Sequence, residues 1–293
     1  MHPRELKLSA ELVPIKKTSS VNVYLTESGG EKFIIKELLT SDVRKRMERS
    51  QKLLAKILES NPNFPCVLAK KSTTLEKREI YIEKFIDGIS LSRKIFCGND
   101  AKIICNNLVN YLRLLRTIRG FDEERATVDW KNFLEGYVTT KTLPSSLFKV
   151  CDPMSLDRFL TYIQKSLSEI HFGDSVSLVH NDLNAGNILV QKDLKIFVID
   201  YEWWIFGDPL KDLSKMIWYF RQFPDFGKIF RATYINEFGE FDENILKFYF
   251  AVDILNHLSQ YEALIYSAIW KVYFEQEFEI IRDIWREGFC LWS

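Results

Sequence analysis

Short runs of apolar and polar residues near the N-terminus predict a small antiparallel sheet. The runs are rich in β-branched and aromatic side chains, which favour strands. Ser28-Gly29-Gly30 separates the second run from the third and is typical of a hairpin turn. The predicted strands lie at residues 11–17, 21–26, 32–38, 66–71 and 79–85.

The spacing of apolar residues changes after the third strand and again near residue 99. From Val43 to Leu58 they recur at helical spacing, with helix-start signals at Thr40 to Asp42 and a stop at Asn61-Pro62. Beyond Asn99 the pattern is helical almost to the end. We therefore expect an α+β fold with an antiparallel β lobe and one helix, followed by a larger, mainly helical lobe. The predicted divisions are 1–85, a connector at 86–98, and 99–293.

The composition excludes several classes of protein. The 293 residues carry 40 basic and 40 acidic side chains, so the net charge is zero, which argues against a general nucleic-acid binder. No apolar run reaches the length of a membrane span, and the first ten residues lack the apolar core of a secretory signal. Five scattered cysteines without a paired motif fit a reducing cytosol. We expect a cytoplasmic protein without a membrane or nucleic-acid partner.

The zero net charge conceals a gradient along the chain. Residues 1–100 hold 19 Lys and Arg against 13 Asp and Glu, a net of +6, whereas residues 201–293 hold 9 against 15, a net of −6. The last 93 residues also contain 25 of the 41 aromatic residues. One interpretation is chance combined with a large helical core. The other is a basic half that faces an anion and an acidic, aromatic half that faces a cation.

Candidate chemistry is concentrated between residues 178 and 214. Two apolar strands, predicted at 188–190 and 196–199, form a hairpin that places Asn187 before the first strand and Asp200 after the second. Asp182 stands five positions before Asn187. Carboxylate and amide oxygens are ligands that Mg²⁺ accepts. The hairpin therefore predicts a metal site with a second carboxylate nearby.

The order of these motifs resembles that of a known superfamily. His180-Asn181-Asp182 with Asn187, followed by Asp200-Tyr201-Glu202 and Gly207-Asp208-Pro209, is similar to aminoglycoside phosphotransferases and choline kinases, which have a protein-kinase-like fold. Protein kinases differ, because they place Arg after the His and Phe-Gly after the metal-binding Asp. An Ala-Pro-Glu segment is also missing, so a protein kinase is a remote alternative. A non-catalytic nucleotide-binding protein is another.

The resemblance implies a role for each motif residue. Asp182 would orient the acceptor hydroxyl and take its proton, while Asn187 and Asp200 would hold Mg²⁺ against the phosphates of ATP. GTP is an alternative nucleotide, because the purine would be read by backbone groups. The alternative for Asp182 and Asp200 is that they are ordinary turn acids.

The resemblance also implies a nucleotide site in the first 90 residues. Lys36, on the third strand, would contact the phosphates, and Glu48 on the helix would pair with Lys36. The alternative for Glu48 is an exposed helix position paired with Arg44. The phosphate-covering loop would use backbone groups at three residues, and the hinge would bind the purine through three others. These are Ser19, Ser20 and Asn22, and Lys84, Phe85 and Ile86.

The acceptor is expected to bind to the helical lobe. Acidic and aromatic side chains suit a small cationic acceptor through charge and cation–π contacts, although most of these aromatics could equally be core. The candidates are Glu202, Trp203, Trp218 and Tyr219. A choline- or ethanolamine-type amino alcohol is slightly favoured. Aminoglycosides, thiamine, sugars and homoserine remain alternatives, and the sequence does not predict the oligomeric state.

Overall fold

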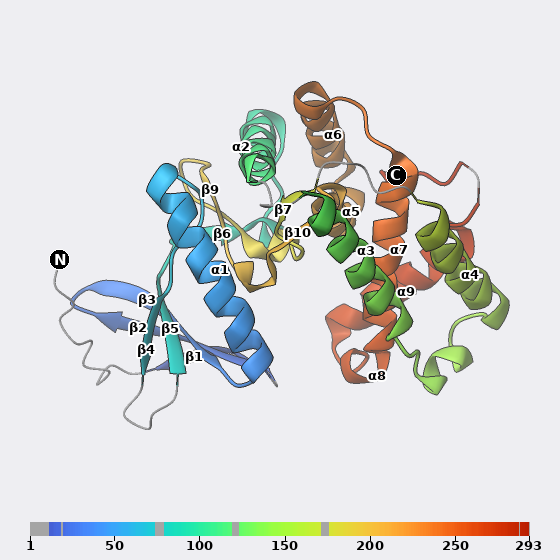
Figure 1. Cartoon of the computed structure of the whole chain (residues 1–293), viewed down its shortest axis with the longest axis horizontal. Helices are drawn as coiled ribbons and strands as arrows, with labels where there is room; N and C mark the ends of the chain where they lie inside the picture. Colours follow the sequence, from blue (N-terminus) through green and yellow to red (C-terminus); the bar gives the residue numbers. More distant parts are fainter. Residues whose placement is uncertain are drawn as a thin grey trace. The chain divides into compact units, whose positions relative to one another are not determined.

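The structure is a computed structural model that describes residues 12–18, 20–73, 79–118, 123–170, 176–286 and 288–292 (Figure 1). Its contacts divide the chain into two compact units. Unit 1 comprises the described residues of Met1–Lys94 together with Gly186–Trp204. Unit 2 comprises those of Ile95–Ala185 and Ile205–Ser293. Asn187 and Asp200 thus belong to the same unit as the N-terminal strands, whereas Asp182 belongs to unit 2.

Unit 1 is built on a five-stranded antiparallel sheet in the order β1-β2-β3-β5-β4. The β2–β3 hairpin pairs Val21 with Leu38 and Ser28 with Glu31. Its turn uses Gly29 and Gly30, whose φ angles of 63° and 80° favour glycine. The strands are β1 (Val13–Lys17), β2 (Val21–Ser28), β3 (Glu31–Leu38), β4 (Lys70–Thr73) and β5 (Glu79–Lys84).

One predicted strand begins later than expected. The sequence predicts a strand over residues 66–71, but β4 starts only at Lys70. In the preceding segment the hydroxyl of Tyr201 donates to the backbone O of Val67 at 3.0 Å and accepts from the N–H of Ala69 at 3.3 Å. A buried side chain from a distant segment therefore satisfies the backbone groups that a neighbouring strand would otherwise pair.

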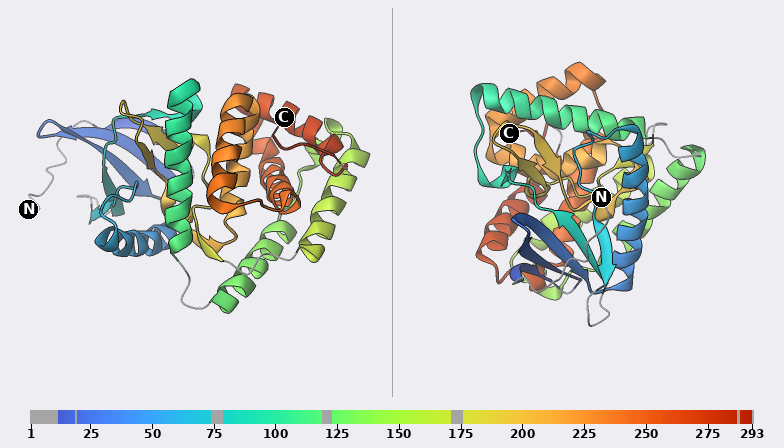
Figure 2. Two further views of the ribbon diagram at one scale, coloured as in Figure 1. Left: turned by 90° about the horizontal axis from the view of Figure 1, so that it is seen from above. Right: turned by 90° about the vertical axis from the view of Figure 1, so that its left-hand side faces the viewer.

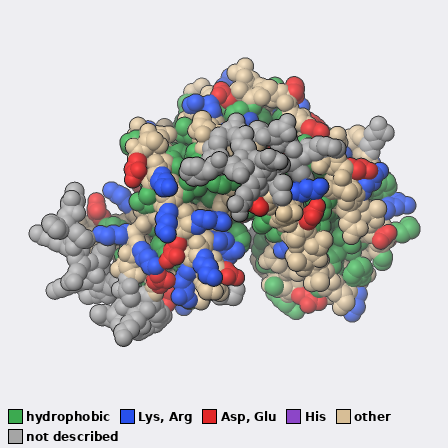
Figure 3. Space-filling model, in the orientation of Figure 1, with side chains coloured by type: hydrophobic (Ala, Val, Ile, Leu, Met, Phe, Trp, Pro, Cys, Tyr) green, Lys and Arg blue, Asp and Glu red, His purple; other side chains and the backbone are tan. Residues whose placement is uncertain are grey.

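The single long helix of unit 1, α1 (Ser41–Ser60), packs on the sheet through its apolar stripe. Thr40 caps it by accepting from the N–H of Val43, and Met47 and Leu54 are fully buried on the inner side. In the views of Figure 2, α1 lies against one side of the sheet. Its outer side is basic, and Figure 3 shows the blue side chains gathered over this region. The exposed basic residues of α1 are Lys45, Arg49, Lys52 and Lys56.

A second, three-stranded sheet in the order β6-β8-β9 completes unit 1. It consists of β6 (Ile89–Ser90), β8 (Ile188–Val190) and β9 (Ile196–Val198). Val198 donates its N–H to the backbone O of Pro65 at 2.8 Å, which ties the β8–β9 hairpin to the segment after α1. This hairpin is the one predicted from the sequence.

Unit 2 is mainly helical and packs around α7. Most residues of α7 are buried, and its contacts with α5 and α4 place it in the middle of the unit (Figure 1). A helix that is apolar on nearly all sides requires such burial. The longer helices are α2 (Gly98–Thr117), α3 (Glu123–Thr139), α4 (Pro153–Glu169), α5 (Leu210–Gln222), α6 (Pro224–Phe238), α7 (Glu243–Ser259) and α9 (Ala268–Asp283). The short α8 (Tyr261–Leu264) and the two-stranded sheet of β7 (Ser177–Val179) and β10 (Ile205–Gly207) complete the described part.

The described ranges contain no helix that is both long enough and apolar enough to cross a membrane. The antiparallel sheet, the single helix after it and the mainly helical remainder confirm the predicted α+β class.

Candidate active site

The β8–β9 hairpin brings Asn187 and Asp200 to the same end of unit 1. The N–H of Ile199 donates to the backbone O of Asn187 at 3.0 Å, so the two strand ends lie side by side. Asp200 adopts the left-handed conformation, with φ 61° and ψ 46°, which few residues other than glycine adopt. Such backbone outliers occur frequently at functional sites. The geometry therefore gives the predicted metal pair a common location.

Lys36 of β3 is held between two carboxylates. Its Nζ lies 2.7 Å from Oδ1 of Asp200 and 3.2 Å from Oε1 of Glu83 on β5, and only 4% of Lys36 is exposed. Burial alone would lower the pKa of the ammonium, but Asp200, Glu83 and Glu202 outweigh burial and raise the pKa well above its usual value. Lys36 thus stays charged, as contact with a nucleotide phosphate requires.

The expected partnership between Lys36 and Glu48 is wrong. Glu48 instead binds Lys71 of β4 at 2.7 Å, and its side chain is 44% exposed. Glu83 is the ion partner instead. It lies on β5, which is next to β3, and its side chain is on the same face of the sheet as that of Lys36. Burial raises the pKa of Glu83, and the charge of Lys36 opposes this rise. Glu83 was overlooked because it falls at the end of a strand beside the predicted hinge, where the sequence gives no sign that it points inward.

The predicted phosphate-covering loop is held by hydrogen bonds between its own residues. The hydroxyl of Thr18 accepts the N–H groups of Ser20 at 3.3 Å and Val21 at 2.9 Å. The side chain of Asn22 donates to Glu37 of β3 at 3.0 Å. These backbone and amide groups are thus engaged within unit 1, and Ser19 lies outside the described residues.

The predicted hinge follows β5 directly. The N–H of Phe85 donates to the backbone O of Lys32 at 3.0 Å. The ammonium of Lys84, which is exposed, lies 3.6 Å from Glu31. Ile86 is half-buried after it. The role of this segment in binding the purine stays a prediction.

The donor set at Asn187 and Asp200 suits Mg²⁺. One carboxylate and one amide oxygen match a metal that keeps several waters and shares its ligands with substrate phosphates. Within the described ranges no cluster of three or more His, Cys, Asp or Glu side chains could form a cage around a metal. The residues therefore fit a metal delivered together with a nucleotide better than a permanent structural ion.

In unit 2, Asp182 lies on a loop whose backbone is hydrogen-bonded to the side chain of Asp212 on α5. The N–H groups of His180 and Asn181 each donate to the Asp212 carboxylate at 2.8 Å, and Asn181 has a left-handed φ of 63°. Burial raises the pKa of Asp212 to about 6, against the two backbone hydrogen bonds. Asn184 donates to the side chain of Asp182 at 3.3 Å. Asp212 therefore holds the backbone of the loop that carries Asp182.

The Gly207-Asp208-Pro209 motif is needed for packing and for the start of α5. A Cβ added at Gly207 would come within 2.7 Å of the Trp130 ring, so this position requires glycine. Asp208 accepts the N–H of Leu210 at 2.9 Å, at the beginning of α5.

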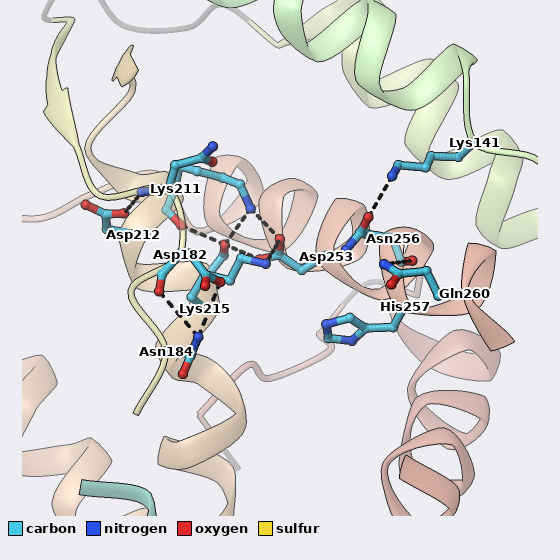
Figure 4. Close-up of polar contacts among 12 residues, drawn as sticks. Lys141, Asp182, Asn184, Lys211, Asp212, Lys215, Asp253, Asn256, His257 and Gln260 are labelled. Atoms are coloured by element: carbon cyan, nitrogen blue, oxygen red, sulfur yellow. Dashed lines mark hydrogen bonds and ion pairs between the residues drawn. The ribbon is translucent and has the colours of Figure 1, made fainter. Parts of the chain in front are cut away.

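A buried charge cluster lies beside Asp182. Asp253 of α7 forms ion pairs with Lys211 and with Lys215, the latter at 3.0 Å, and accepts the hydroxyl of Ser214 at 2.6 Å (Figure 4). Burial would lower the pKa of Lys215, but the charges of Asp253 and Asp182 outweigh burial and raise it. Sequence reasoning missed this cluster. The available signal was two lysines four positions apart on a helix that is otherwise largely apolar.

The four residues predicted to bind the acceptor are divided between the two units, with Glu202 and Trp203 in unit 1 and the other two in unit 2. Glu202 is buried in unit 1, where burial, opposed by the charge of Lys36, raises its pKa to about 7. Trp203 already has a cation over its ring, because the guanidinium of Arg46 lies 3.9 Å from the centroid. Trp218 and Tyr219 lie on different sides of α5. Trp218 packs on Phe250, and Tyr219, only 3% exposed, packs on Phe226. The core interpretation therefore holds for Tyr219.

Comparisons with known proteins place this geometry in a family. A model of the phosphotransferase enzyme family matches residues 11–249. A thermostable mutant of aminoglycoside phosphotransferase APH(4)-Ia, in a ternary complex with AMP-PNP and hygromycin B, is similar in structure, with a TM-score of 0.69 and 14% identity over 97% of each chain.

Two further solved structures are similar. Spectinomycin phosphotransferase APH(9)-Ia in complex with ADP and spectinomycin has a TM-score of 0.61 at 16% identity, covering 95% of this chain and 89% of its own. Aminoglycoside-3'-phosphotransferase of type VIII has a TM-score of 0.63 at 17% identity, covering 85% and 95%. These likenesses show the fold and confirm the resemblance to the aminoglycoside phosphotransferase group. The chain belongs to the phosphotransferase enzyme family and has its protein-kinase-like α+β fold.

Proposed function

We propose that this phosphotransferase is an ATP- and Mg²⁺-dependent kinase that transfers the γ-phosphate to a hydroxyl group of a small molecule. The observation that carries the proposal is the buried ion pair between Lys36 and Asp200, with Asn187 on the neighbouring strand end. A phosphate-contacting cation and two metal-ligating oxygens are the parts that phosphoryl transfer needs most, because the reaction depends on positioning and charge neutralisation.

Each residue then has a defined task. Lys36 would bind the nucleotide phosphates, and Glu83 would hold Lys36 in position. Asn187 and Asp200 would ligate Mg²⁺, which neutralises charge on the phosphates when it is bound. Asp182 would orient the acceptor hydroxyl and accept its proton as the oxygen bonds to the γ-phosphorus and ADP leaves. ATP is preferred over GTP in this proposal, since the neighbours were solved with ADP or AMP-PNP.

The acceptor we propose is a polyhydroxylated small molecule rather than choline. The neighbours named above are aminoglycoside and spectinomycin phosphotransferases. Among the acceptors predicted from the sequence, this favours the aminoglycosides over the amino alcohols. The contacts of the candidate aromatic residues within each unit support the same choice, because each ring already has a partner: Arg46 lies over Trp203 in unit 1, and in unit 2 Trp218 packs on Phe250 and Tyr219 on Phe226. Sugars and homoserine remain within the proposed range.

Acceptor-dependent release of ADP from ATP tests the proposed reaction. Purified protein with Mg²⁺ should release ADP faster with one member of a panel of aminoglycosides, spectinomycin, sugars, homoserine, thiamine, ethanolamine and choline. Mass spectrometry should then find one added phosphoryl group on that acceptor. ADP release without any phosphorylated small molecule, or phosphate found only on a protein, would contradict the proposal.

Substituting Glu83 should weaken nucleotide binding, whereas substituting Glu48 should not. Glu83→Gln removes a buried charge partner of Lys36, and a charge-assisted hydrogen bond contributes about 1.5–3 kcal/mol. We therefore expect the Kd for ATP, measured by calorimetry without an acceptor, to rise about tenfold. Glu48→Gln is the matched control, because its exposed ion pair with Lys71 should contribute little. Equal effects of the two substitutions would show that Glu83 does not position Lys36.

A further inference from the structure

The polar face of α7 carries a series of contacts that begins beside Asp182. Asp253, Asn256 and His257 of α7, together with its C-cap residue Gln260, recur at helical spacing after a stretch that is apolar from Phe248 to Val252. Figure 4 shows them as a row, with Lys215 reaching Asp253 from α5 and Lys141 reaching Asn256 from the other end. A polar group on a buried helix costs free energy unless it forms a hydrogen bond or an ion pair. The row therefore calls for an explanation.

Two acidic side chains, Asp253 of this row and Glu277 of the neighbouring helix α9, already have partners within unit 2. Asp253 binds two lysines and a serine hydroxyl. Glu277, which is fully buried, lies 2.6 Å from the Nδ1 of His257. Asp253 therefore neutralises lysines of the protein itself and Glu277 contacts a histidine, so both acidic side chains serve contacts within unit 2.

Lys141 is the exception among the cations of the row. Its Nζ donates to Oδ1 of Asn256 at 2.7 Å and lies 4.4 Å from the centroid of the Tyr137 ring. Within the described ranges no carboxylate forms an ion pair with it. Burial lowers the pKa of Lys141, and the positive charge of Lys215 lowers it further. The half-buried ammonium of Lys141 thus contacts a neutral amide and an aromatic ring, and an anion beside it would complete this arrangement.

The simplest explanation for the position of Lys141 is that it follows the C-terminal end of a helix. It lies two residues beyond α3, where a lysine can interact with the last carbonyl groups. Its ammonium instead crosses to the side chain of Asn256 on α7. Because Oδ1 of Asn256 accepts from Lys141, its amide NH₂ presents two further donors next to the ammonium. An ammonium and an amide NH₂ together match the two oxygens of a carboxylate.

We infer that Lys141 and Asn256 form a subsite for an acidic group, most simply a carboxylate, on the acceptor molecule. The inference rests on the proposed kinase function and narrows its acceptor to a hydroxylated acid, such as a sugar acid or a hydroxy amino acid. It selects these acids over choline and also over aminoglycosides, which are polyamines, so the test below decides between this subsite and the acceptors that the names of the neighbours suggest. Asp182 then receives the hydroxyl of the acceptor, and Figure 4 shows Lys215 and Asp253 between Asp182 and Asn256.

Matched acceptors that differ only in charge provide the test. D-gluconate, D-glucitol and glucamine share a hydroxylated chain and carry a carboxylate, a hydroxyl and an amine at the end. D-glycerate, glycerol and 3-amino-1,2-propanediol form a second, shorter set. Binding to the ADP-saturated protein is measured by calorimetry, and phosphorylation is measured by ADP release. We expect the acidic member of at least one set to bind about tenfold more tightly than its neutral counterpart.

The variants locate the effect. Lys141→Met should remove the preference for the acidic member, and Asn256→Asp should do the same, because the new carboxylate would pair with Lys141. Lys141→Arg should keep the preference. Lys131→Met is the control, because Lys131 is an exposed lysine on α3. No preference in the wild type, or a preference that survives Lys141→Met, would overturn the subsite.

Three further outcomes separate the subsite from the proposed reaction and from the nucleotide. If the amine members are phosphorylated in preference, the kinase function stands and the subsite is wrong. If the acid binds through Lys141 but no compound is ever phosphorylated, the subsite stands and the kinase function is wrong. Weaker ATP binding in Lys141→Met would assign the cation to the nucleotide phosphates and would overturn its role with the acceptor.

Discussion

Replacing Asp182 with asparagine is expected to lower kcat by about 10²- to 10⁴-fold, the range for loss of a general base. Asparagine keeps the size of the side chain but cannot take the proton of the acceptor hydroxyl. Asp182 belongs to unit 2, whereas Lys36, Asn187 and Asp200 belong to unit 1. The Kd for ATP should therefore change by no more than about twofold. Steady-state ADP release with the best acceptor and calorimetry with ATP measure the two quantities.

Asp193→Asn is the control for this substitution. Asp193 is an exposed acid in the turn of the β8–β9 hairpin, where it pairs with Lys195 at 2.8 Å. Its replacement tests whether any lost carboxylate in this segment impairs turnover. Retention of more than about a tenth of wild-type kcat in Asp182→Asn would remove Asp182 from the role of base. A parallel loss of kcat and ATP binding would indicate a structural role instead.

The parts of the site that the sequence predicts are those set by local chain geometry. Asn187 and Asp200 flank an apolar hairpin, so the pairing of two short strands is enough to bring them together. Lys36 points inward because it lies on the buried side of a strand in the middle of the sheet. In the hairpin the pairing of the two strands determines the result, and in β3 the pairing with β5 places Lys36 on the same face as Glu83. The same local rules predicted α1 to within a residue.

The parts that the sequence does not predict depend on contacts between distant segments. Whether Lys36 pairs with Glu48 or Glu83 depends on the rotation of α1 and on the neighbour of β3 in the sheet, and neither is encoded locally. The cluster of Lys211, Lys215 and Asp253 joins two helices that are far apart in the sequence. The divisions at 1–85, 86–98 and 99–293 stay a prediction. In the structure residues 186–204 belong to the same unit as the N-terminal strands. A division of the chain into consecutive segments does not predict this.

Removing Asp253 should cause the largest loss of stability. Its side chain is 2% exposed and neutralises both Lys211 and Lys215. Asp253→Ala would leave two ammonium groups in the interior without their partner, and breaking a buried pair typically costs about 3–5 kcal/mol. Chemical denaturation should show this loss in the free energy of unfolding. Asp225→Ala should change it by less than about 0.5 kcal/mol, because Asp225 is an acid whose side chain is 96% exposed.

A double variant distinguishes the cost of an unpaired charge from the value of the ion pair. Lys211→Met with Asp253→Leu removes the fully buried pair and fills its space with apolar groups, which is often close to neutral. Lys215 keeps a route to water, since 14% of its side chain is exposed. We therefore expect the double variant to regain most of the stability lost in Asp253→Ala. A double variant as unstable as the single one would show that Asp253 stabilises unit 2 by more than neutralising Lys211.

The loss in Asp253→Ala should also depend on pH in a defined direction. Burial alone would raise the pKa of Asp253, but Lys211 and Lys215 outweigh burial and lower it below that of an unfolded aspartate. A group with a lowered pKa in the folded state contributes its full stability above its unfolded pKa, which is about 3.9. It loses that contribution as the pH falls towards the folded value. The difference in unfolding free energy between wild type and Asp253→Ala should therefore be constant from about pH 5 to 7 and shrink below about pH 4. A difference that grows in acid would mean that the carboxyl group is protonated in the folded protein at neutral pH, and that the cluster carries an uncompensated positive charge beside Asp182.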